Sequence, residues 1–313
     1  MSTMPASEEA VRAALHGVID PELRRPIDEL GMLESVAVDG GRVTVRVLLT
    51  IAGCPLRGTI DGDVRAALAS VPGVEEAAVE LDVMTPQQRQ ELRERLRPER
   101  GIPFSRPDSL TKVFAVASGK GGVGKSSLTV NLACELASRG LSVGIVDADV
   151  HGFSVPGLLG AAGTPTQVDD MILPPVAHGV KVISIGMFVE GNQPVAWRGP
   201  MLHRALEQFL GDVYFGDLDV LFLDLPPGTG DIAISVSQLL PNAELIVVTT
   251  PQAAAADVAE RAGSVSAQTG QKVAGVIENM SGLTLPDGTV MEVFGSGGAS
   301  AWPSGSRPCS APR

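Results

Sequence analysis

A stretch of eight residues rich in glycine constrains the fold of this chain more than any other feature. It reads Gly-Lys-Gly-Gly-Val-Gly-Lys-Ser over residues 119–126, between the apolar run Val113–Ser118 and a helical pattern that continues to Arg139. A strand that turns through such a loop into a helix aims main-chain N–H groups at one point. The stretch therefore predicts a phosphate-binding loop (P-loop) in an α/β fold.

Each residue type in this loop has a physical task. Glycine tolerates positive φ angles and lets N–H groups approach phosphate oxygens, and the following helix adds its positive N-terminal end. We expect Lys125 to neutralise the β and γ phosphates of ATP and the Ser126 hydroxyl to bind Mg²⁺. The alternative is a glycine-rich turn without a ligand. The predicted nucleotide-binding residues of the loop are Gly119, Gly121, Gly122, Val123, Gly124, Lys125, Ser126 and Ser127.

Carboxylates end two further apolar runs. Asp147 and Asp149 close the strand predicted at Leu141–Asp147, and Asp224 ends the run that begins at Val220. Strands of a parallel sheet end at one edge, so we expect these carboxylates beside the loop. We expect Asp224 to lie next to Mg²⁺, and Asp147 and Asp149 either to hold Mg²⁺ or to orient the attacking water. A pair of strand-end caps is the alternative for Asp147 and Asp149, and a main-chain N–H of Gly228 is a candidate donor to the γ phosphate.

The order of the predicted elements indicates two domains and a linker. Residues 5–96 alternate helical and strand patterns and predict a small α+β domain, and residues 97–110, rich in proline and charge, predict a linker. In residues 111–298, strands alternate with helices, which predicts a mostly parallel sheet covered by helices on both faces. Helices are expected at Met201–Leu210, Ile232–Leu240 and Ala253–Thr269. Residues 299–313 are expected to be disordered.

Composition limits the partners. The net charge of −12 and an aromatic content of 4% disfavour nucleic acid. No apolar stretch is long enough for a membrane span, and the N-terminus does not resemble a secretory signal. The three cysteines are far apart, so a disulfide framework is not expected and a reducing cytoplasm fits best.

The second lysine of the loop, Lys120, makes the motif more specific. KGGVGKS resembles the deviant Walker A signature of the MinD, ParA and nitrogenase iron-protein class. The resemblance implies that Lys120 reaches the nucleotide of a partner subunit, so that the protein acts as a homodimer. It also implies that Asp149 positions the attacking water and that Asn279 contacts the adenine base. A solvated lysine and a structural loop asparagine are the alternatives.

Longer motifs resemble one family within that class, the Mrp/ApbC iron–sulfur cluster carriers. They are PVAWRGPM at 194–201, DLPPGTGD at 224–231 and IENMSG at 277–282, with Asp-Pro-Glu at 20–22 and Gly-Cys-Pro at 53–55. The resemblance implies a small iron–sulfur assembly-type domain joined to a MinD-like ATPase. It also implies slow Mg²⁺-dependent ATP hydrolysis and transfer of an iron–sulfur cluster to apoproteins.

Two features depart from that family. Many members carry C-x-x-C after the Asn-Met-Ser segment, whereas residues 279–289 contain no cysteine. Thiolates are the usual cluster ligands, so Cys54 is the remaining candidate, with a buried apolar cysteine as the alternative. The sequence after residue 298 also departs from the family, and we interpret the P-loop domain as incomplete at its C-terminal end, through a frameshift or truncation.

Two other functions remain open from the sequence. A MinD- or ParA-type positioning ATPase would use the same dimer switch but would need a membrane-binding helix or a basic DNA-binding surface. A scaffold that keeps the fold without hydrolysis would need none of the catalytic groups. The N-terminal domain favours the carrier, and the intact nucleotide motifs favour an enzyme.

Overall fold

The computed structural model describes residues 6–51, 53–54, 56–96, 101–149, 152–161, 164–188, 199–228, 231–251, 270–292 and 294–295. The chain divides into two compact units. The N-terminal unit comprises residues 1–100 and Thr166–Leu173, and the P-loop unit comprises Gly101–Pro165 and Pro174–Arg313. The helix predicted at Ala253–Thr269 and the tail at 299–313 lie outside the described residues.

The N-terminal unit is a three-stranded sheet with helices. Strand β2 (Arg42–Leu49) pairs antiparallel with β1 (Leu33–Asp39) and parallel with β3 (Glu76–Val83). Val43, Val45 and Val47 alternate along β2 and are fully buried, so one face of the sheet carries the core. Helices α1 (Glu8–His16) and α2 (Arg57–Ala69) pack against the sheet and each other, and α3 (Pro86–Leu96) follows β3.

The P-loop unit is built on a seven-stranded sheet in the order β12-β11-β4-β10-β5-β9-β8. Only β8 (Val176–Ala177) runs antiparallel to its neighbour among these described strands. Every residue of β5, β9 and β10 is buried, as expected for strands covered on both faces. The parallel strands are β4 (Lys112–Ser118), β5 (Val143–Asp147), β9 (Val180–Ser184), β10 (Val220–Asp224), β11 (Glu244–Thr249) and β12 (Val273–Glu278).

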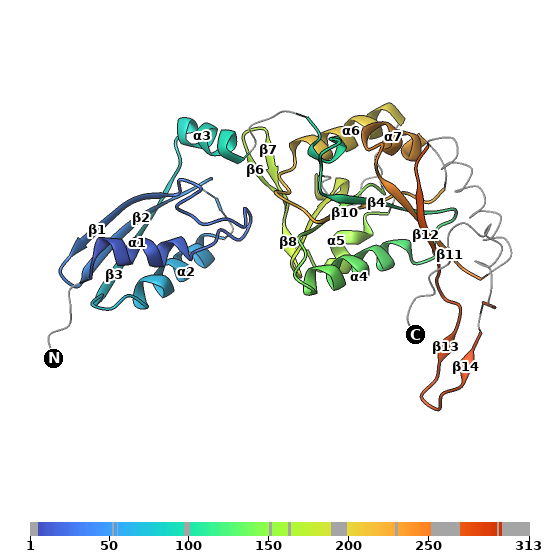
Figure 1. Cartoon of the computed structure of the whole chain (residues 1–313), viewed down its shortest axis with the longest axis horizontal. Helices are drawn as coiled ribbons and strands as arrows, with labels where there is room; N and C mark the ends of the chain where they lie inside the picture. The colour runs from blue at the N-terminus through green and yellow to red at the C-terminus, as the bar shows by residue number, and fades with distance from the viewer. Residues whose placement is uncertain are drawn as a thin grey trace. The chain divides into compact units, whose positions relative to one another are not determined.

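Helices cover both faces of this sheet (Figure 1). Helices α4 (Lys125–Ser138) and α5 (Ser154–Leu159) lie on one face, and α6 (Gly199–Asp212) and α7 (Asp231–Leu239) lie on the other. The prediction of an α/β P-loop fold with a mostly parallel sheet and a small N-terminal α+β domain is confirmed. No helix among the described residues combines the length and the apolar character that crossing a bilayer requires.

Two 3₁₀ turns among the described residues also belong to the P-loop unit. The 3₁₀ turn η1 (Pro103–Ser105) lies in the predicted linker, and its Phe104 packs edge-on against Phe215 at 5.9 Å between ring centroids. Residues from Gly101 onward are therefore part of the P-loop unit. A second 3₁₀ turn, η2 (Ile185–Phe188), follows β9.

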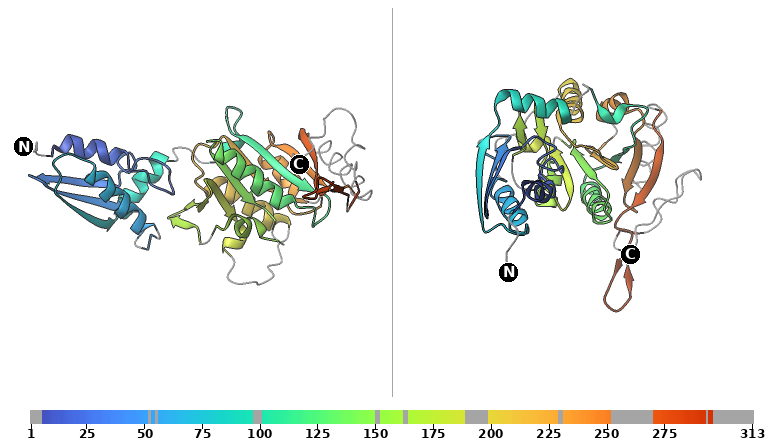
Figure 2. Two further views of the ribbon diagram at one scale, coloured as in Figure 1. Left: turned by 90° about the horizontal axis from the view of Figure 1, so that it is seen from below. Right: turned by 60° about the vertical axis from the view of Figure 1, so that its left-hand side comes forward.

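Two hairpins lie outside the main sheet. Strands β13 (Leu283–Thr284) and β14 (Val290–Met291) project from the P-loop unit (Figures 1 and 2). Strands β6 (Thr166–Val168) and β7 (Met171–Leu173) form the other hairpin, which groups with the N-terminal residues. The domain boundaries predicted from the sequence assigned these residues to the P-loop domain. Their contacts with the N-terminal residues join segments that are far apart in the chain, which a local sequence pattern does not reveal.

Candidate functional site

The glycine-rich loop joins β4 to α4 through two residues in the left-handed region. Gly122 has φ 78° and Gly124 has φ 82°, and α4 begins directly after Gly124. Residues with a Cβ atom are strained at such angles, which explains glycine at both positions. The loop therefore has the expected strand–loop–helix geometry at the carboxyl end of β4.

Lys125, Ser126 and Thr129 converge on the carboxylate of Asp224. The Lys125 ammonium lies 2.7 Å from Asp224 Oδ1, the Ser126 hydroxyl donates to Oδ2 at 2.5 Å, and the Thr129 hydroxyl donates to Oδ1 at 3.1 Å. Asp224 is fully buried and Lys125 nearly so. A buried charge is tolerated when it is paired and hydrogen-bonded, as here. The predicted loop residues and the predicted Walker B carboxylate thus meet in one buried cluster.

Asp147 ends β5, beside Asp224 at the end of β10, with which it is in register. Its carboxylate accepts hydrogen bonds from the Ser184 hydroxyl and the Asp149 N–H, both at 3.1 Å. Burial, reinforced by the negative charge of Asp224, raises the pKa of Asp147 to about 7. Asp147 therefore titrates near neutral pH, where a carboxylate can act as an acid or a base.

The other predicted catalytic groups lie on the loops around this edge. Asp149 follows β5 and is half-buried, and its carboxylate faces Gly152. Lys120 is half-buried, and its carbonyl oxygen accepts a hydrogen bond from the Ser118 hydroxyl. The N–H of Gly228 donates to the Ser118 carbonyl oxygen at 2.7 Å. In this structure the Gly228 N–H is therefore engaged within the protein.

Asn279 contacts the phosphate loop although it lies 156 residues from Val123 in the sequence. It follows β12, and its side-chain amide donates to the Val123 carbonyl oxygen at 2.9 Å. A Cβ atom at Gly124 would clash with the same amide group. The sequence predicted Asn279 as a contact of the base. In this structure its amide hydrogen-bonds to the P-loop, and its contact with the adenine base stays a prediction.

Comparison with known proteins agrees with this geometry. Residues 109–306 match the family model described as the NUBPL iron-transfer P-loop NTPase. The chain belongs to this family of P-loop NTPases. Residues 8–81 of this P-loop NTPase match a second model, described as an iron–sulfur cluster assembly protein.

Individual relatives extend over both units of the P-loop NTPase. The iron–sulfur cluster carrier protein of Mycobacterium tuberculosis is 66% identical over 92% of this chain and 77% of its own length. That of Bacillus subtilis is 39% identical, over 93% and 83%. Among solved structures, an ADP complex of a nucleotide-binding protein from Archaeoglobus fulgidus is 38% identical, with a TM-score of 0.52 over 60% of this chain and 75% of its own. The resemblance to cluster carriers of the Mrp/ApbC type is confirmed.

Sequence analysis missed two residues of the P-loop NTPase site. Thr129 lies one helical turn after Lys125 and is fully buried, and Ser184 ends β9, next to β5. A threonine four residues after the loop lysine lies on the same helix face, and a serine at the end of a strand lies at the edge where ligands bind. Both signals were present in the sequence.

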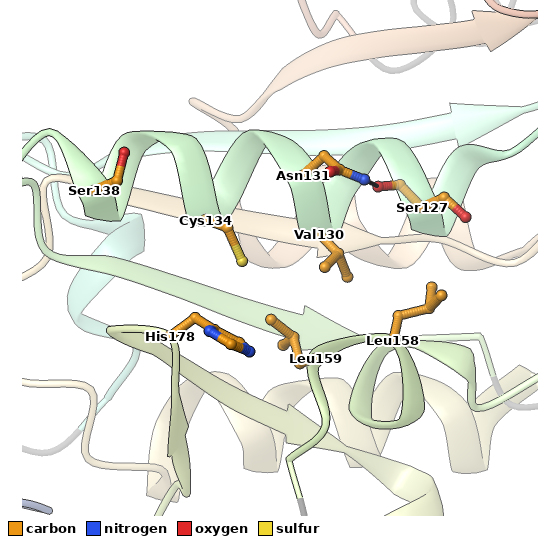
Figure 3. Close-up of a pocket in the computed structure, with 8 residues that line it drawn as sticks. All are labelled: Ser127, Val130, Asn131, Cys134, Ser138, Leu158, Leu159 and His178. Atoms are coloured by element: carbon orange, nitrogen blue, oxygen red, sulfur yellow. Dashed lines mark hydrogen bonds between the residues drawn. The ribbon is translucent and has the colours of Figure 1, made fainter.

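Ser127, by contrast, lies on another face of α4 from Ser126. Its side chain lines a groove with a volume of about 520 Å³, together with Cys134, Leu158 and His178 (Figure 3). The Ser127 carbonyl oxygen accepts a hydrogen bond from the Asn131 amide at 2.7 Å. The role predicted for Ser127 in nucleotide binding stays a prediction.

Cys54 belongs to the N-terminal unit, just before α2. Its side chain is buried, and this burial raises the pKa of the thiol, with a smaller contribution from the negative charges of Glu22 and Asp20. Within the part of the chain that the structure describes, no three acidic, histidine or cysteine side chains converge in a way that would hold a metal ion. Cluster binding by Cys54 therefore stays a prediction.

Proposed function

We propose that this chain binds and hydrolyses ATP and carries iron–sulfur clusters to apoproteins. The observation that carries the proposal is the buried cluster in which Lys125, Ser126 and Thr129 surround Asp224 at the end of the glycine-rich loop. The names of the relatives supply the cargo, and the assembly-protein match at residues 8–81 favours a carrier over a MinD- or ParA-type positioning ATPase.

In the proposed reaction, main-chain N–H groups of residues 119–126 bind the phosphate oxygens of ATP. In this structure the Lys125 ammonium pairs with Asp224. When ATP binds, the ammonium neutralises the charge of the β and γ phosphates. Asp149 orients the attacking water, and Gly228 offers its N–H to the γ phosphate. Asn279 contacts the base once its amide leaves the Val123 carbonyl oxygen.

The oxygen ligands at this edge fit Mg²⁺. A hydroxyl and carboxylates are the donors that this hard cation prefers, and the Ser126 hydroxyl lies 2.5 Å from Asp224 Oδ2. Ser126 and Asp224, with Asp147 acting through water, would hold the ion. Mg²⁺ would neutralise charge that develops on the phosphates.

A homodimer completes the proposed site. Lys120 lies in the loop and, as in the class that the motif resembles, would neutralise the nucleotide of the partner subunit. Binding of ATP would then close the dimer and hydrolysis would open it. We further propose Cys54 as a thiolate ligand of the cluster, apo iron–sulfur proteins as acceptors, and the cytoplasm as the location, without membrane or nucleic acid as partners.

Phosphate release tests the enzymatic part of the proposal. Wild type should release phosphate from ATP slowly and only with Mg²⁺, and Lys125→Ala should release none. Lys112→Ala, an exposed lysine at the opposite end of β4, is the matched control and should behave as wild type. Equal release by wild type and Lys125→Ala would remove the enzyme assignment.

Anaerobic reconstitution with Fe²⁺ and sulfide tests the carrier part. Visible absorbance should report a bound cluster, and an apo iron–sulfur protein should gain that cluster when mixed with the loaded chain. Cys54→Ser should lose the cluster, whereas Cys134→Ser on α4 should keep it. A wild type that binds no cluster contradicts the carrier assignment, and an unchanged Cys54→Ser contradicts only the ligand assignment.

A further inference from the structure

The groove beside helix α4 is lined by a thiol and an imidazole, the side chains of Cys134 and His178 (Figure 3). Cys134 is a free, half-buried cysteine on α4, and its sulfur points into the groove. His178 lies in the turn between β8 and β9 and is exposed. The groove has a volume of about 520 Å³, which is enough for a metal ion with bound water molecules.

The backbone fixes the position of His178 next to α4. Ala177 pairs with Val180, so the turn contains only His178 and Gly179, with φ angles of 50° and 78°. Two consecutive positive φ angles are typical of a tight type I′ hairpin turn. Gly179 packs against α4, because a Cβ atom at Gly179 would lie 3.5 Å from Ala137 Cβ. The turn that carries His178 therefore contacts the helix that carries Cys134.

Helix geometry places Cys134 on the face of α4 that this turn contacts. Residues three apart lie on the same side of a helix, and Cys134 precedes Ala137 by three positions. Cys134, Ala137 and Ala177 also pack against one buried core. In Figure 3 the Cys134 sulfur points toward the His178 ring. The thiol and the imidazole therefore face the same groove from two separate elements.

Neither group takes part in the proposed nucleotide site. Lys125 and Ser126 contact Asp224 in the first turn of α4, whereas Cys134 lies about two turns further along the helix. Within the described part of the chain, no hydrogen bond or ion pair engages the Cys134 thiol or the His178 ring. Both groups are therefore available to a ligand in the groove.

We propose that Cys134 and His178 bind a divalent transition-metal ion of the Zn²⁺ type in this groove. Thiolate sulfur and imidazole nitrogen are ligands that Zn²⁺ prefers, and this ion takes four ligands in a tetrahedron. No third acidic, histidine or cysteine side chain joins them among the described residues, so water fills the other two positions. The thiol releases its proton to solvent when the sulfur binds the ion.

The bound ion links α4 to the β8–β9 turn and stabilises the folded P-loop unit, because the unfolded chain does not hold the two ligands together. The site is separate from Cys54, the predicted ligand of the cluster. It also does not depend on the proposed hydrolysis of ATP, so either assignment can fail without the other.

Anaerobic titration of the full chain with Co²⁺ tests this site, because Co²⁺ bound to a thiolate shows a sulfur-to-metal charge-transfer absorbance. We expect this absorbance in wild type and its displacement by Zn²⁺. Cys134→Ala should lose the absorbance. His178→Gly should raise the Kd for Co²⁺ at least about tenfold, since even a residue that only supports a metal ligand contributes about 10–100-fold. Glycine retains the positive φ angle that the turn requires.

Matched variants separate the two ligands from their surroundings. Ser138→Ala changes another residue that lines the groove, and His203→Ala removes a histidine of α6. Cys54→Ser and Cys309→Ser remove the other two thiols of the chain. All four variants should keep the absorbance that Cys134 contributes and bind Co²⁺ in the groove with the Kd of wild type.

A second measurement on wild type does not require any variant to fold. Peptide mapping by mass spectrometry follows the alkylation of Cys134 by iodoacetamide, and saturating Zn²⁺ should slow this reaction at least about tenfold, because the metal occupies the thiolate that reacts. Zn²⁺ should also raise the unfolding temperature of wild type but not that of Cys134→Ala or His178→Gly.

The outcomes decide the proposal. A wild type without charge-transfer absorbance, absorbance that persists in Cys134→Ala, or alkylation of Cys134 at an unchanged rate in Zn²⁺ overturns the site. An unchanged Kd in His178→Gly overturns the part given to His178, and with it the two-ligand site.

Discussion

The ammonium group of Lys125 lies 2.7 Å from Oδ1 of Asp224, and only 6% of the lysine side chain and none of the aspartate side chain is exposed. The lysine opens the helix after the phosphate loop, and the aspartate ends the strand next to β4. Their ion pair joins the phosphate loop to the end of β10.

Removal of the lysine charge should destabilise the fold as well as abolish nucleotide binding. Lys125→Ala leaves the Asp224 carboxylate buried without its counter-charge, and we expect the free energy of unfolding to fall by about 3 kcal/mol. Urea denaturation without nucleotide measures the change. Lys112→Ala should change it by less than about 0.5 kcal/mol. A Lys125→Ala protein as stable as wild type would show that the ion pair is not a net structural contact.

The buried Thr129 hydroxyl should contribute to stability through Asp224. Thr129→Val keeps the shape of the side chain but removes one donor from a buried carboxylate, so we expect a loss of about 1–3 kcal/mol in the free energy of unfolding. Thr44→Val, at a half-buried position on β2, is the control and should be close to neutral. Equal urea midpoints for both variants would contradict the role given to Thr129.

Asp147 should make stability depend on pH between about 4 and 7. Burial and the negative charge of Asp224 raise its pKa to about 7 in the folded chain, from the ordinary value of 3.8 for an aspartate. In this window the folded state binds more protons than the unfolded state, so this group lowers stability as pH rises. Asp147→Asn lacks the charge. Relative to wild type, the variant should gain up to about 4 kcal/mol between pH 4 and pH 8.

Urea denaturation at several pH values, in buffer without Mg²⁺ and nucleotide, measures that difference. Ser184→Ala provides a second check, because it removes a hydrogen bond that favours the ionised form of Asp147 and should steepen the loss of stability with pH. A stability difference between Asp147→Asn and wild type that stays constant over this range would contradict the raised pKa.

Gly124 should tolerate alanine less well than another glycine with a similar backbone. Gly124 and Gly140 have φ angles of 82° and 87°, but a Cβ atom at Gly124 would clash with Asn279, whereas nothing lies within 4 Å at Gly140. Gly140→Ala should lose about 1–2 kcal/mol through backbone strain alone. Gly124→Ala should lose more and should bind ATP weakly.

Adding Asn279→Ala to Gly124→Ala removes the clashing amide and should recover part of the lost stability. Thermal unfolding and equilibrium dialysis with ATP measure the two effects. If Gly124→Ala and Gly140→Ala unfold at the same temperature, the contact between Asn279 and the loop does not constrain this position.

The local pattern of the sequence determined the nucleotide site in outline. Glycine at the positions of positive φ, Lys125 at the start of a helix and Asp224 at the end of an apolar run are each encoded by a few neighbouring residues. The alternation of strands and helices predicted a parallel sheet. In such a sheet the carboxyl ends of the strands lie at one edge, which placed the carboxylates beside the loop. These inferences need only residues that are close together in the chain.

Tertiary structure alone decided which distant groups share that edge. Ser184 donates to Asp147, and Asn279 donates to the Val123 carbonyl oxygen. In the N-terminal unit, a hydrogen bond from the Thr166 hydroxyl to Glu22 likewise joins residues that are far apart in the chain. No local pattern specifies these pairs, because a buried polar group takes whichever partner the packing of other elements brings within reach. The sequence determined the chemistry that each segment could supply, and the packing of the segments decided which groups meet.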